Sequence, residues 1–422
     1  MSYKLTENQS ITKGAEWINR DEVLDIFNLE YFEQRTLYRV LEIIGENYEE
    51  IIADVQDVLF EIFDFEHTDI NMDWMSFILY GDKCPLGKYG YSRDHHPDKK
   101  QLTIGLSELF SPINVPIGMT VREGNVNDQI HLNDTFNQVS HRLREGSMIV
   151  LDKGANRKEN LERIENSKLK FLTVRQINKS DESTWLKNFD KSMAELVDER
   201  YGVYGLKKKF PCRINYLFFS EDLYEKQIEA KLRKVERLFI EAEKIQQSIE
   251  NKRKLPKKYR INNQLVECEY SYQTKLATLS ESEAKNTLKK ASITGREGFF
   301  CMVSNKDLTL REALAIYRQK DSIEKISNSL KNENENEIKP LRCWSDMSIY
   351  GALIVGFLAQ LFISLIRFEH PELKHTSPKF IKISLMNLTL TVEYKKSGGK
   401  RHIFSNFNLL SQVILAQNQA IT

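Results

Sequence analysis

The spacing of apolar residues changes along this 422-residue chain, and that change constrains the fold more than any other feature of the sequence. Over residues 15–66, apolar side chains recur every three to four positions, which predicts amphipathic helices. From about 70 to 175 they alternate instead, in short stretches separated by Gly, Pro and Asn clusters. Three antiparallel strands are therefore predicted around the alternating residues at 75–79, 102–106 and 117–121, and the first of them includes the D-W-M-S stretch at 73–76.

Two further strands, each preceded by a helix, follow these three. A helical pattern covers roughly 127–144, and the apolar run 148–151 is typical of a buried strand. A second helix near 156–167 precedes a strand at 170–175. The order strand, strand, strand, helix, strand, helix, strand predicts a ribonuclease H-like α/β core, which is a mixed sheet flanked by helices.

Residues 176–298 interrupt this order and are predicted to form an inserted helix-plus-strand domain. Apolar residues at near-heptad spacing over 228–249 predict one long helix, with strand-like pieces at 214–219 and 264–276. The core pattern resumes with a strand at 299–303, followed by one helix that begins at a capping box and runs to about residue 331.

Five segments follow from these patterns. They are an acidic helical N-terminal segment (1–69), the first part of the α/β core (70–175), the insertion (176–298), the second part of the core (299–370) and a C-terminal tail (371–422). In the tail, alternation at Ile381 and Ile383 and then at Leu388, Leu390 and Val392 predicts a terminal strand pair.

Composition places the chain among globular proteins, because 41% of its residues are hydrophobic and 10% are aromatic. Its five cysteines are scattered without a C-x-x-C spacing, so neither a zinc site nor a redox pair is expected. The N-terminus has no apolar run behind a basic start, which argues against a signal peptide. A cytoplasmic location fits these features best.

Charge is distributed unevenly, although the net charge is only +1. Residues 1–72 contain seventeen acidic and five basic residues, whereas the rest of the chain has thirteen more bases than acids. Residues 204–260 contain sixteen bases and eight acids. The densest basic run contains Lys252, Arg253, Lys254, Lys257 and Lys258. Such side chains either bind the phosphates of a nucleic acid or only solvate a surface, and the sequence leaves both interpretations open.

Three acidic residues occupy positions suited to a metal site. Asp73 lies in the first predicted strand, Asp152 ends the strand 148–151, and Glu324 lies on the helix after the last core strand. Strand ends with a helix packed against them can gather carboxylates, and hard cations such as Mg²⁺ prefer such oxygen ligands. Spacing alone is weak evidence, because the chain has sixty acidic residues.

The helix that carries Glu324 strengthens the hypothesis. If the helix is continuous, Tyr317, Lys320, Glu324 and Lys331 fall within one arc of about 60° on its surface. An acid beside two cations and a phenol on one exposed stripe suits a helix that faces both a metal ion and a phosphate backbone. The alternative is a solvated face with an ordinary mixture of charges.

These residues match the pattern of a known family. Tyr317-x2-Lys320-x3-Glu324-x6-Lys331 resembles the Tyr-x2-Arg-x3-Glu-x6-Lys signature of the insertion-sequence-four group of DDE-type transposases. The stretches D-W-M-S at 73–76, YGYSRDHHPDKKQLTIGL at 89–106, VPIGMTVREGNVND at 115–128 and LDKGANRKENL at 151–161 also resemble motifs of that family, as do GFFCMVSNKDLT at 298–309 and IKPLRCWSDMSIYGALIVGFLAQLF at 338–362.

The resemblance implies a function as well as a fold. Asp73, Asp152 and Glu324 would be the catalytic, metal-binding triad on a ribonuclease H-like core, holding two Mg²⁺ or Mn²⁺ ions for DNA cleavage and strand transfer. Tyr317, Lys320 and Lys331 would contact the double-stranded DNA of the transposon end. A homodimer in the synaptic complex, target DNA as a second substrate and a prokaryotic, nucleoid-associated location in the cytoplasm are also implied.

Two departures from the family pattern bear on activity. Lys320 replaces an Arg, which loses the planar fork that binds phosphate bidentately, and Met75 replaces a Thr, which loses a hydroxyl near the first Asp. A catalytically decayed, transposase-derived DNA-binding protein is therefore the alternative.

A membrane protein is the rival interpretation from another class. The apolar run 349–366 has eighteen residues, which is the lower end of what spans a bilayer. We favour a buried core helix, and hence no membrane partner, because a single span at this position would separate the Glu324 helix from the tail.

Overall fold

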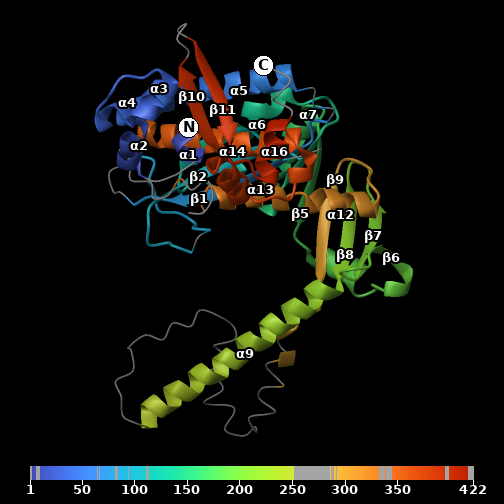
Figure 1. Ribbon diagram of the computed structural model, residues 1–422. Coiled ribbons are helices and arrows are strands. Elements are labelled where there is room, and N and C mark those ends of the chain that lie inside the picture. Colours follow the sequence, from blue (N-terminus) through green and yellow to red (C-terminus); the bar gives the residue numbers. More distant parts are fainter. Residues whose placement is uncertain are drawn as a thin grey trace. The chain divides into compact units, whose positions relative to one another are not determined.

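The computed structural model describes residues 2–5, 10–63, 65, 67–80, 84–93, 95–110, 114–250, 286, 289–290, 292–331, 338, 345–394 and 399–416. The chain divides into two compact units (Figure 1). The first contains residues 1–173 and 315–422, and the second contains residues 174–314. The second unit thus includes the strand at 299–304, which the sequence pattern assigned to the core.

A mixed sheet is the centre of the first unit. Its strands are β1 (Ile70–Ile78), β2 (Gln101–Leu109), β3 (Val115–Glu123), β4 (Met148–Leu151) and β5 (Lys170–Arg175). They lie in the order β3-β2-β1-β4-β5. β1, β2 and β3 pair antiparallel, whereas β4 pairs parallel with both β1 and β5. Helices α6 (Asp128–Val139) and α7 (Lys158–Asn166) precede β4 and β5, so the predicted α/β order is confirmed.

Five helices form the N-terminal segment: α1 (Ser2–Leu5), α2 (Ile11–Ile18), α3 (Asp21–Phe27), α4 (Gln34–Glu46) and α5 (Tyr48–Ile62). Of these, α4 packs closely against α14 (Asp346–Glu369). Glycine permits this approach, because a Cβ on Gly45 would overlap the carbonyl of Met347, and one on Gly351 would overlap the carbonyl of Leu41.

The apolar run near the C-terminus is a core helix of this unit. Ile349, Leu353, Ile354 and Phe357 of α14 are buried in a cluster with residues of β1, β2 and β3. Among the described residues, α14 is the one helix long and apolar enough to cross a membrane, and 61% of its most apolar stretch is buried. Its apolar character is therefore explained by packing inside the protein.

A buried polar network joins α6 to the sheet. The two ring nitrogens of His131 lie 2.9 Å from the hydroxyl of Thr120 and 3.3 Å from that of Thr103. The indole of Trp74 on β1 donates to Thr135 on the same helix at 3.2 Å. The imidazole, the indole and these three hydroxyls thus have partners, which offsets the cost of taking them out of water.

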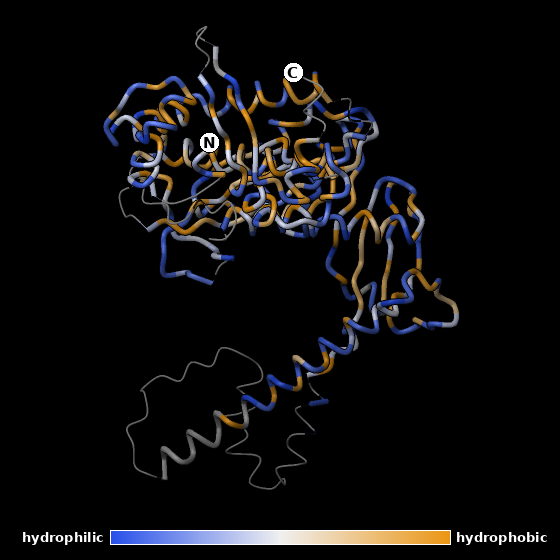
Figure 2. The backbone as a smooth tube through the Cα atoms, viewed as in Figure 1, coloured by the Kyte–Doolittle hydropathy of each residue, from blue (hydrophilic) through white to orange (hydrophobic). Residues whose placement is uncertain are grey.

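Four strands of the second unit lie in the order β9-β8-β7-β6, and each pairs antiparallel with its neighbour in that order. These are β6 (Glu195–Asp198), β7 (Val203–Lys209), β8 (Ile214–Ser220) and β9 (Phe299–Ser304). The long helix α9 (Glu221–Glu250) follows β8, and Figure 2 shows hydrophilic and hydrophobic residues alternating along its described part. The sequence pattern predicted β8, β9 and α9 but not β6 or β7. The predicted strand at 264–276 lies outside the described residues.

Short elements complete the two units. They are η1 (Ser140–Arg142), η2 (Lys153–Ala155), α8 (Lys179–Asp181), η3 (Glu182–Leu186), η4 (Lys191–Met193), η6 (Pro371–Leu373) and α16 (Leu409–Ala416). In the tail, β10 (Thr389–Tyr394) pairs antiparallel with β11 (Lys400–Ser405). The expected strand at Ile381 and Ile383 was wrong, because these residues lie in helix α15 (Pro378–Met386), which begins with Ser377 as its N-cap and Pro378 in its first turn.

Candidate active site

Asp73 lies in the middle of β1, opposite Leu106 of β2. Side chains alternate along a strand, so Asn71, Asp73, Met75 and Phe77 share one face of β1. This face packs against α13 (Asp321–Ser329), because Met75 and Phe77 share an apolar cluster with Ile323 of that helix. The Asp73 side chain is largely buried, with 18% of its surface exposed.

Asp152 follows β4 directly, and the parallel register places it beside Asp73. Asn71 pairs with Val150, so two residues further along, Asp73 and Asp152 are level on neighbouring strands. The side chain of Asp152 is 49% exposed. The sequence pattern correctly put this acid at the end of a strand, where ligands commonly bind in α/β sheets.

The loop after Asp152 is held by polar contacts from α6 and α7. Asn160 donates to the carbonyl of Ala155 at 2.9 Å, and the side chain of Gln129 accepts from the amide of Arg157 at 2.9 Å and donates to the carbonyl of Gly154. A Cβ on Gly154 would lie 2.5 Å from the carboxylate of Asp128, so a larger residue here would displace that side chain. These contacts fix the backbone next to Asp152.

Glu324 lies on α13, but the predicted single helix is two helices. The first, α12 (Leu310–Arg318), ends two residues before α13 begins, and Gln319 and Lys320 form the junction. Asn71 of β1 donates to the carbonyl of Gln319 at 3.2 Å, which ties this junction to the sheet. The stripe calculated for a continuous helix is therefore interrupted at Lys320.

The side chain of Lys320 lies among all three acids. Its Nζ is 3.2 Å from Oδ1 of Asp73, 3.8 Å from Oε1 of Glu324 and 3.9 Å from Oδ1 of Asp152. Only 6% of the lysine side chain is exposed. The sequence analysis placed Lys320 on an exposed stripe, whereas here it is the buried cation around which the three carboxylates gather.

Burial and mutual repulsion set the electrostatics of this cluster. Burial raises the pKa of Asp73 above its ordinary value, and the neighbouring charge of Asp152 adds to this effect, whereas Lys320 opposes it. Burial likewise raises the pKa of Glu324, against the opposing effect of Lys320. Burial alone would lower the pKa of Lys320, but the charges of Asp73, Asp152 and Glu324 outweigh it and raise the pKa. The cluster therefore favours a cation at its centre.

Tyr317 lies beside the acids, whereas Lys331 lies beside Phe77 of β1. Burial raises the pKa of the Tyr317 phenol, and the carboxylates of Asp152 and Glu324 raise it further. The ammonium of Lys331 lies 5.9 Å from the ring centroid of Phe77, on the same face of β1 as Asp73. The structure thus brings Tyr317 next to the acids and places Lys331 about 13 Å further along the face of β1 that carries Asp73.

The donors of the cluster suit a divalent cation, because all three acids offer carboxylate oxygens and face one centre of positive charge. Within the described residues, no group of three or more His, Cys, Asp or Glu side chains has the spacing of a metal site. The side chains of Asp152 and Glu324 are 49% and 58% exposed, so they can rotate to bind a common ion. The residues therefore fit the implied metal by their chemistry, and two of the three side chains must move to coordinate it.

Sequence reasoning missed two residues that support the site. Asn71 was not singled out, although it lies two positions before Asp73 and holds the α12–α13 junction. Glu108, which pairs with Asn71 across β1 and β2, is fully buried, and neither carboxylate oxygen has a hydrogen bond of good geometry. A charged residue within an otherwise apolar strand pattern was the available signal for Glu108.

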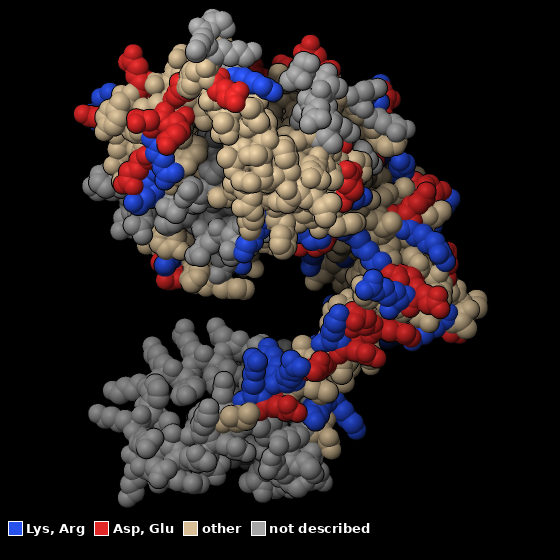
Figure 3. All heavy atoms as spheres, viewed as in Figure 1, with Lys and Arg blue, Asp and Glu red and all other residues tan. Residues whose placement is uncertain are grey.

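The predicted basic surface is only partly described. Lys252, Arg253, Lys254, Lys257 and Lys258 lie outside the described residues. In the described part of the second unit, Figure 3 shows basic and acidic side chains interspersed. Ion pairs account for part of this mixture, because Lys207 and Lys209 both contact Asp307.

Comparisons with known proteins give a likeness to solved structures but none to a protein family. No protein-family model and no curated protein matches the sequence. A cryo-EM structure of a piggyBac transposase synaptic complex with hairpin DNA matches over 89% of this chain and 80% of that chain, with 9% sequence identity and a TM-score of 0.36. A TM-score of this size does not establish a shared fold, and the geometry of the carboxylate cluster is the basis for assigning a function.

Proposed function

We propose that this protein is a DDE-type transposase of the insertion-sequence-four group, which cleaves DNA and transfers strands at the ends of an insertion sequence on a ribonuclease H-like core. One observation carries the proposal. Asp73, Asp152 and Glu324 are far apart in the chain, yet the ammonium of Lys320 lies within 3.9 Å of all three. The same three acids occupy the positions that the family motifs give to the catalytic residues.

The proposed chemistry is in-line phosphoryl transfer, for which the protein needs no nucleophile of its own. Asp73, Asp152 and Glu324 would hold two Mg²⁺ or Mn²⁺ ions, which supply activation of the attacking oxygen and stabilisation of the leaving one. Asp73 is fixed by the sheet, whereas Glu324 lies on a helix tied to the sheet through Asn71. The two acids would therefore reach the metal ions from two elements that the contact with Asn71 holds together.

Lys320 would have two roles in this proposal. Without metal, its charge offsets the repulsion among the three acids. With metal and DNA bound, the ammonium would turn to a phosphate oxygen next to the scissile bond, which is a charge-assisted contact that a lysine can make as a point charge. Tyr317 and Lys331 would contact the same DNA strand. Double-stranded transposon ends and target DNA are the proposed partners, with a homodimer at synapsis in the prokaryotic cytoplasm.

Cleavage by isosteric variants tests the assignment. Asp73→Asn, Asp152→Asn and Glu324→Gln should each reduce Mg²⁺- or Mn²⁺-dependent cleavage of the element's terminal repeats by at least about 100-fold, because each removes one carboxylate ligand. Asp321→Asn is the matched control, since this acid lies on the same helix but pairs with Lys325 at the surface. Near-normal cleavage by any of the first three variants would remove that acid from the triad.

The geometry of Lys320 also supports the alternative of a catalytically decayed DNA-binding protein. A buried lysine at the centre of the acids competes with a metal ion, and Met75 beside Asp73 lies in the apolar core instead of offering a hydroxyl. Titration with Mn²⁺ distinguishes the two functions. A decayed protein would bind the transposon ends without binding Mn²⁺ at Asp73 and Asp152. The enzyme would bind the transposon ends and Mn²⁺.

A further inference from the structure

A cavity of about 450 Å³ lies against α13, and none of the three acids lines it. Ser322, Lys325, Ile326 and Ser329 of α13 line it, and at 100° per residue they form one stripe. Glu324 is about 150° from the centre of that stripe. Most of the lining on this helix therefore lies away from Glu324, and Asn328, which also lines the cavity, is about 40° from Glu324.

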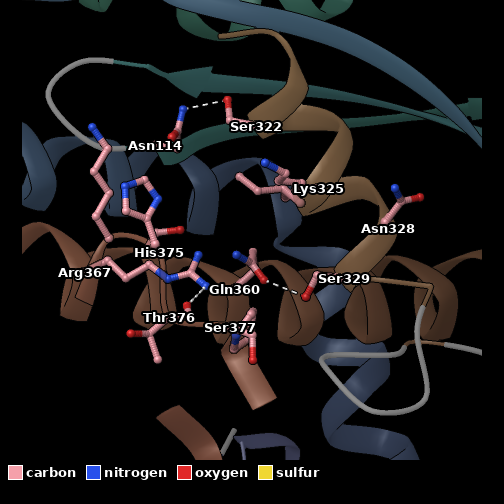
Figure 4. Close-up of a pocket in the computed structure, with 14 residues that line it drawn as sticks. Asn114, Ser322, Lys325, Asn328, Ser329, Gln360, Arg367, His375, Thr376 and Ser377 are labelled. Atoms are coloured by element: carbon pink, nitrogen blue, oxygen red, sulfur yellow. Dashed lines mark hydrogen bonds between the residues drawn. The ribbon is translucent and has the colours of Figure 1, made fainter. Parts of the chain in front are cut away.

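The rest of the cavity wall comes from α14 and from the segment that leads into α15. Arg367 and Gln360 project from α14, and Lys374 and His375 come from the following segment. Figure 4 shows Asn114 and Ser322 on one side of the space, with Gln360 and Arg367 on the other. All these residues belong to the first unit.

The lining is basic and rich in hydrogen-bond donors. It contains three cations, the His375 ring, several amides and hydroxyls, and no carboxylate among the described residues. Two contacts hold the wall in place: Ser329 donates to Gln360 at 3.0 Å, and Arg367 donates to the carbonyl of Thr376. A cavity of this size with converging cations and neutral donors suits a small anion or one charged group of a larger ligand.

Two acids lie near the wall, and neither opposes an anion strongly. Asp321 pairs with Lys325 at 2.6 Å, but both side chains are mostly exposed, so the pair is weak and Lys325 can exchange partners. Glu108 lies behind Asn114 and Ser322, and burial raises its pKa to about 8. At neutral pH its carboxyl group is therefore mostly protonated.

We propose that this cavity binds a phosphate group, as a second phosphate site behind α13 and separate from the acid cluster. Lys325, Arg367 and Lys374 supply the positive charge, and Asn114, Asn328 and Gln360 supply amide groups. The phosphate comes either from a DNA backbone that passes behind α13 or from free phosphate or a nucleotide. Because α13 is the shared wall, occupation of this site also restrains the helix that carries Glu324.

Binding of inorganic phosphate to the full-length protein, measured by calorimetry at low ionic strength, tests the proposal. The double variant Lys325→Gln/Lys374→Gln should lose at least about tenfold in phosphate affinity, because it removes two charge-assisted contacts. Arg367 is left intact, since it also holds the loop. The control is Lys158→Gln/Lys168→Gln, which neutralises two exposed, ion-paired lysines outside the cavity.

Salt-dependent binding of duplex DNA by the same variants distinguishes the two sources. The measured quantity is the slope of the logarithm of the DNA-binding constant against the logarithm of the salt concentration. If this slope falls by about two in the cavity variant and not in the control, the DNA backbone is the source of the phosphate. An unchanged slope with lost phosphate binding identifies a free phosphate ligand. The proposal is overturned if the cavity variant matches wild type in both measurements, or if the control variant loses as much as the cavity variant.

Discussion

The Nζ atom of Lys320 lies 3.2 Å from Oδ1 of Asp73, although 247 positions separate the two residues in the chain. Both side chains are largely buried, so water screens this pair only weakly. The same ammonium faces Asp152 and Glu324, which are about half exposed. The lysine thus joins the helix α13 to the sheet and holds three like charges near one another.

Removing that charge should destabilise the metal-free protein. Lys320→Met keeps a side chain of similar length but leaves Asp73 buried without its partner, which costs about 3 kcal/mol of unfolding free energy. Millimolar Mg²⁺ or Mn²⁺ should then raise the melting temperature of the variant more than that of wild type, because the cation replaces the lost charge.

The matched control for this experiment is Lys325→Met, on the same helix. Its ion pair with Asp321 is exposed, so its loss should cost at most about 1 kcal/mol and leave the metal response unchanged. Equal metal-induced shifts in Lys320→Met and wild type would show that the cation does not bind among these acids.

The sequence predicted the positions of the acids better than their surroundings. Hydrophobic periodicity located β1, β4 and the helical region after β9, and the parallel pairing of β1 with β4 makes Asp73 and Asp152 neighbours. The break between α12 and α13 was not predictable from periodicity, because Gln319 and Lys320 are good helix formers and the break depends on the contact with Asn71. A tertiary contact therefore determines where the helix breaks, and the local sequence pattern does not contain that contact.

The strands of the second unit were also only partly predictable from local sequence patterns. β8 and β9 were predicted from apolar residues, whereas β7 ends in three lysines, Lys207, Lys208 and Lys209, which gives no apolar alternation. The strand is stabilised by pairing with β8 along its whole length and by the contacts of Lys207 and Lys209 with Asp307. Such partners are distant in sequence, so no window of neighbouring residues reveals them.

The basic run at 252–258 is expected to bind DNA. Changing Lys252, Arg253, Lys254, Lys257 and Lys258 to Gln should weaken binding to the transposon ends and reduce the log–log salt slope by about one for each lost phosphate contact. Lys207→Gln/Lys209→Gln is the control, because Asp307 already pairs with both lysines. A slope unchanged by the five substitutions would mean that the run only solvates the surface.

Buried His131 should make stability depend on pH in the acidic range. Burial lowers its pKa from 6.5 to about 4, so between these values the unfolded chain binds a proton that the folded protein excludes. Stability is therefore lost as the pH falls from about 6.5 to about 4, by at most about 1.4 kcal/mol per pH unit. Chemical denaturation of wild type and His131→Gln should show this dependence in wild type and a weaker one in the variant. If the unfolding free energies of wild type and His131→Gln change with pH in the same way, the lowered pKa of His131 is contradicted.

Buried Glu108 should make the protein less stable as the pH rises, whereas His131 makes it less stable as the pH falls. Burial raises its pKa from 4.5 to about 8, although Ser322 and Asn114 oppose the shift. Between these two values the folded protein binds a proton that the unfolded chain releases, so this contribution to stability is complete below about 4.5 and is lost as the pH rises to about 8.

Glu108→Gln keeps the shape of the side chain and cannot ionise, so the variant should gain stability relative to wild type as the pH rises from about 5 to about 8. The gain should be at most about 1.4 kcal/mol per pH unit and should level off above about 8. Denaturation with urea in the presence of a chelator measures the difference without any effect of metal on Asp73. Glu123→Gln on β3 is the control, because this acid is not fully buried and its substitution should leave the profile unchanged. If the difference between Glu108→Gln and wild type stays constant from pH 5 to pH 8, Glu108 is ionised in the folded protein and must have a charged partner near Asn114 and Ser322.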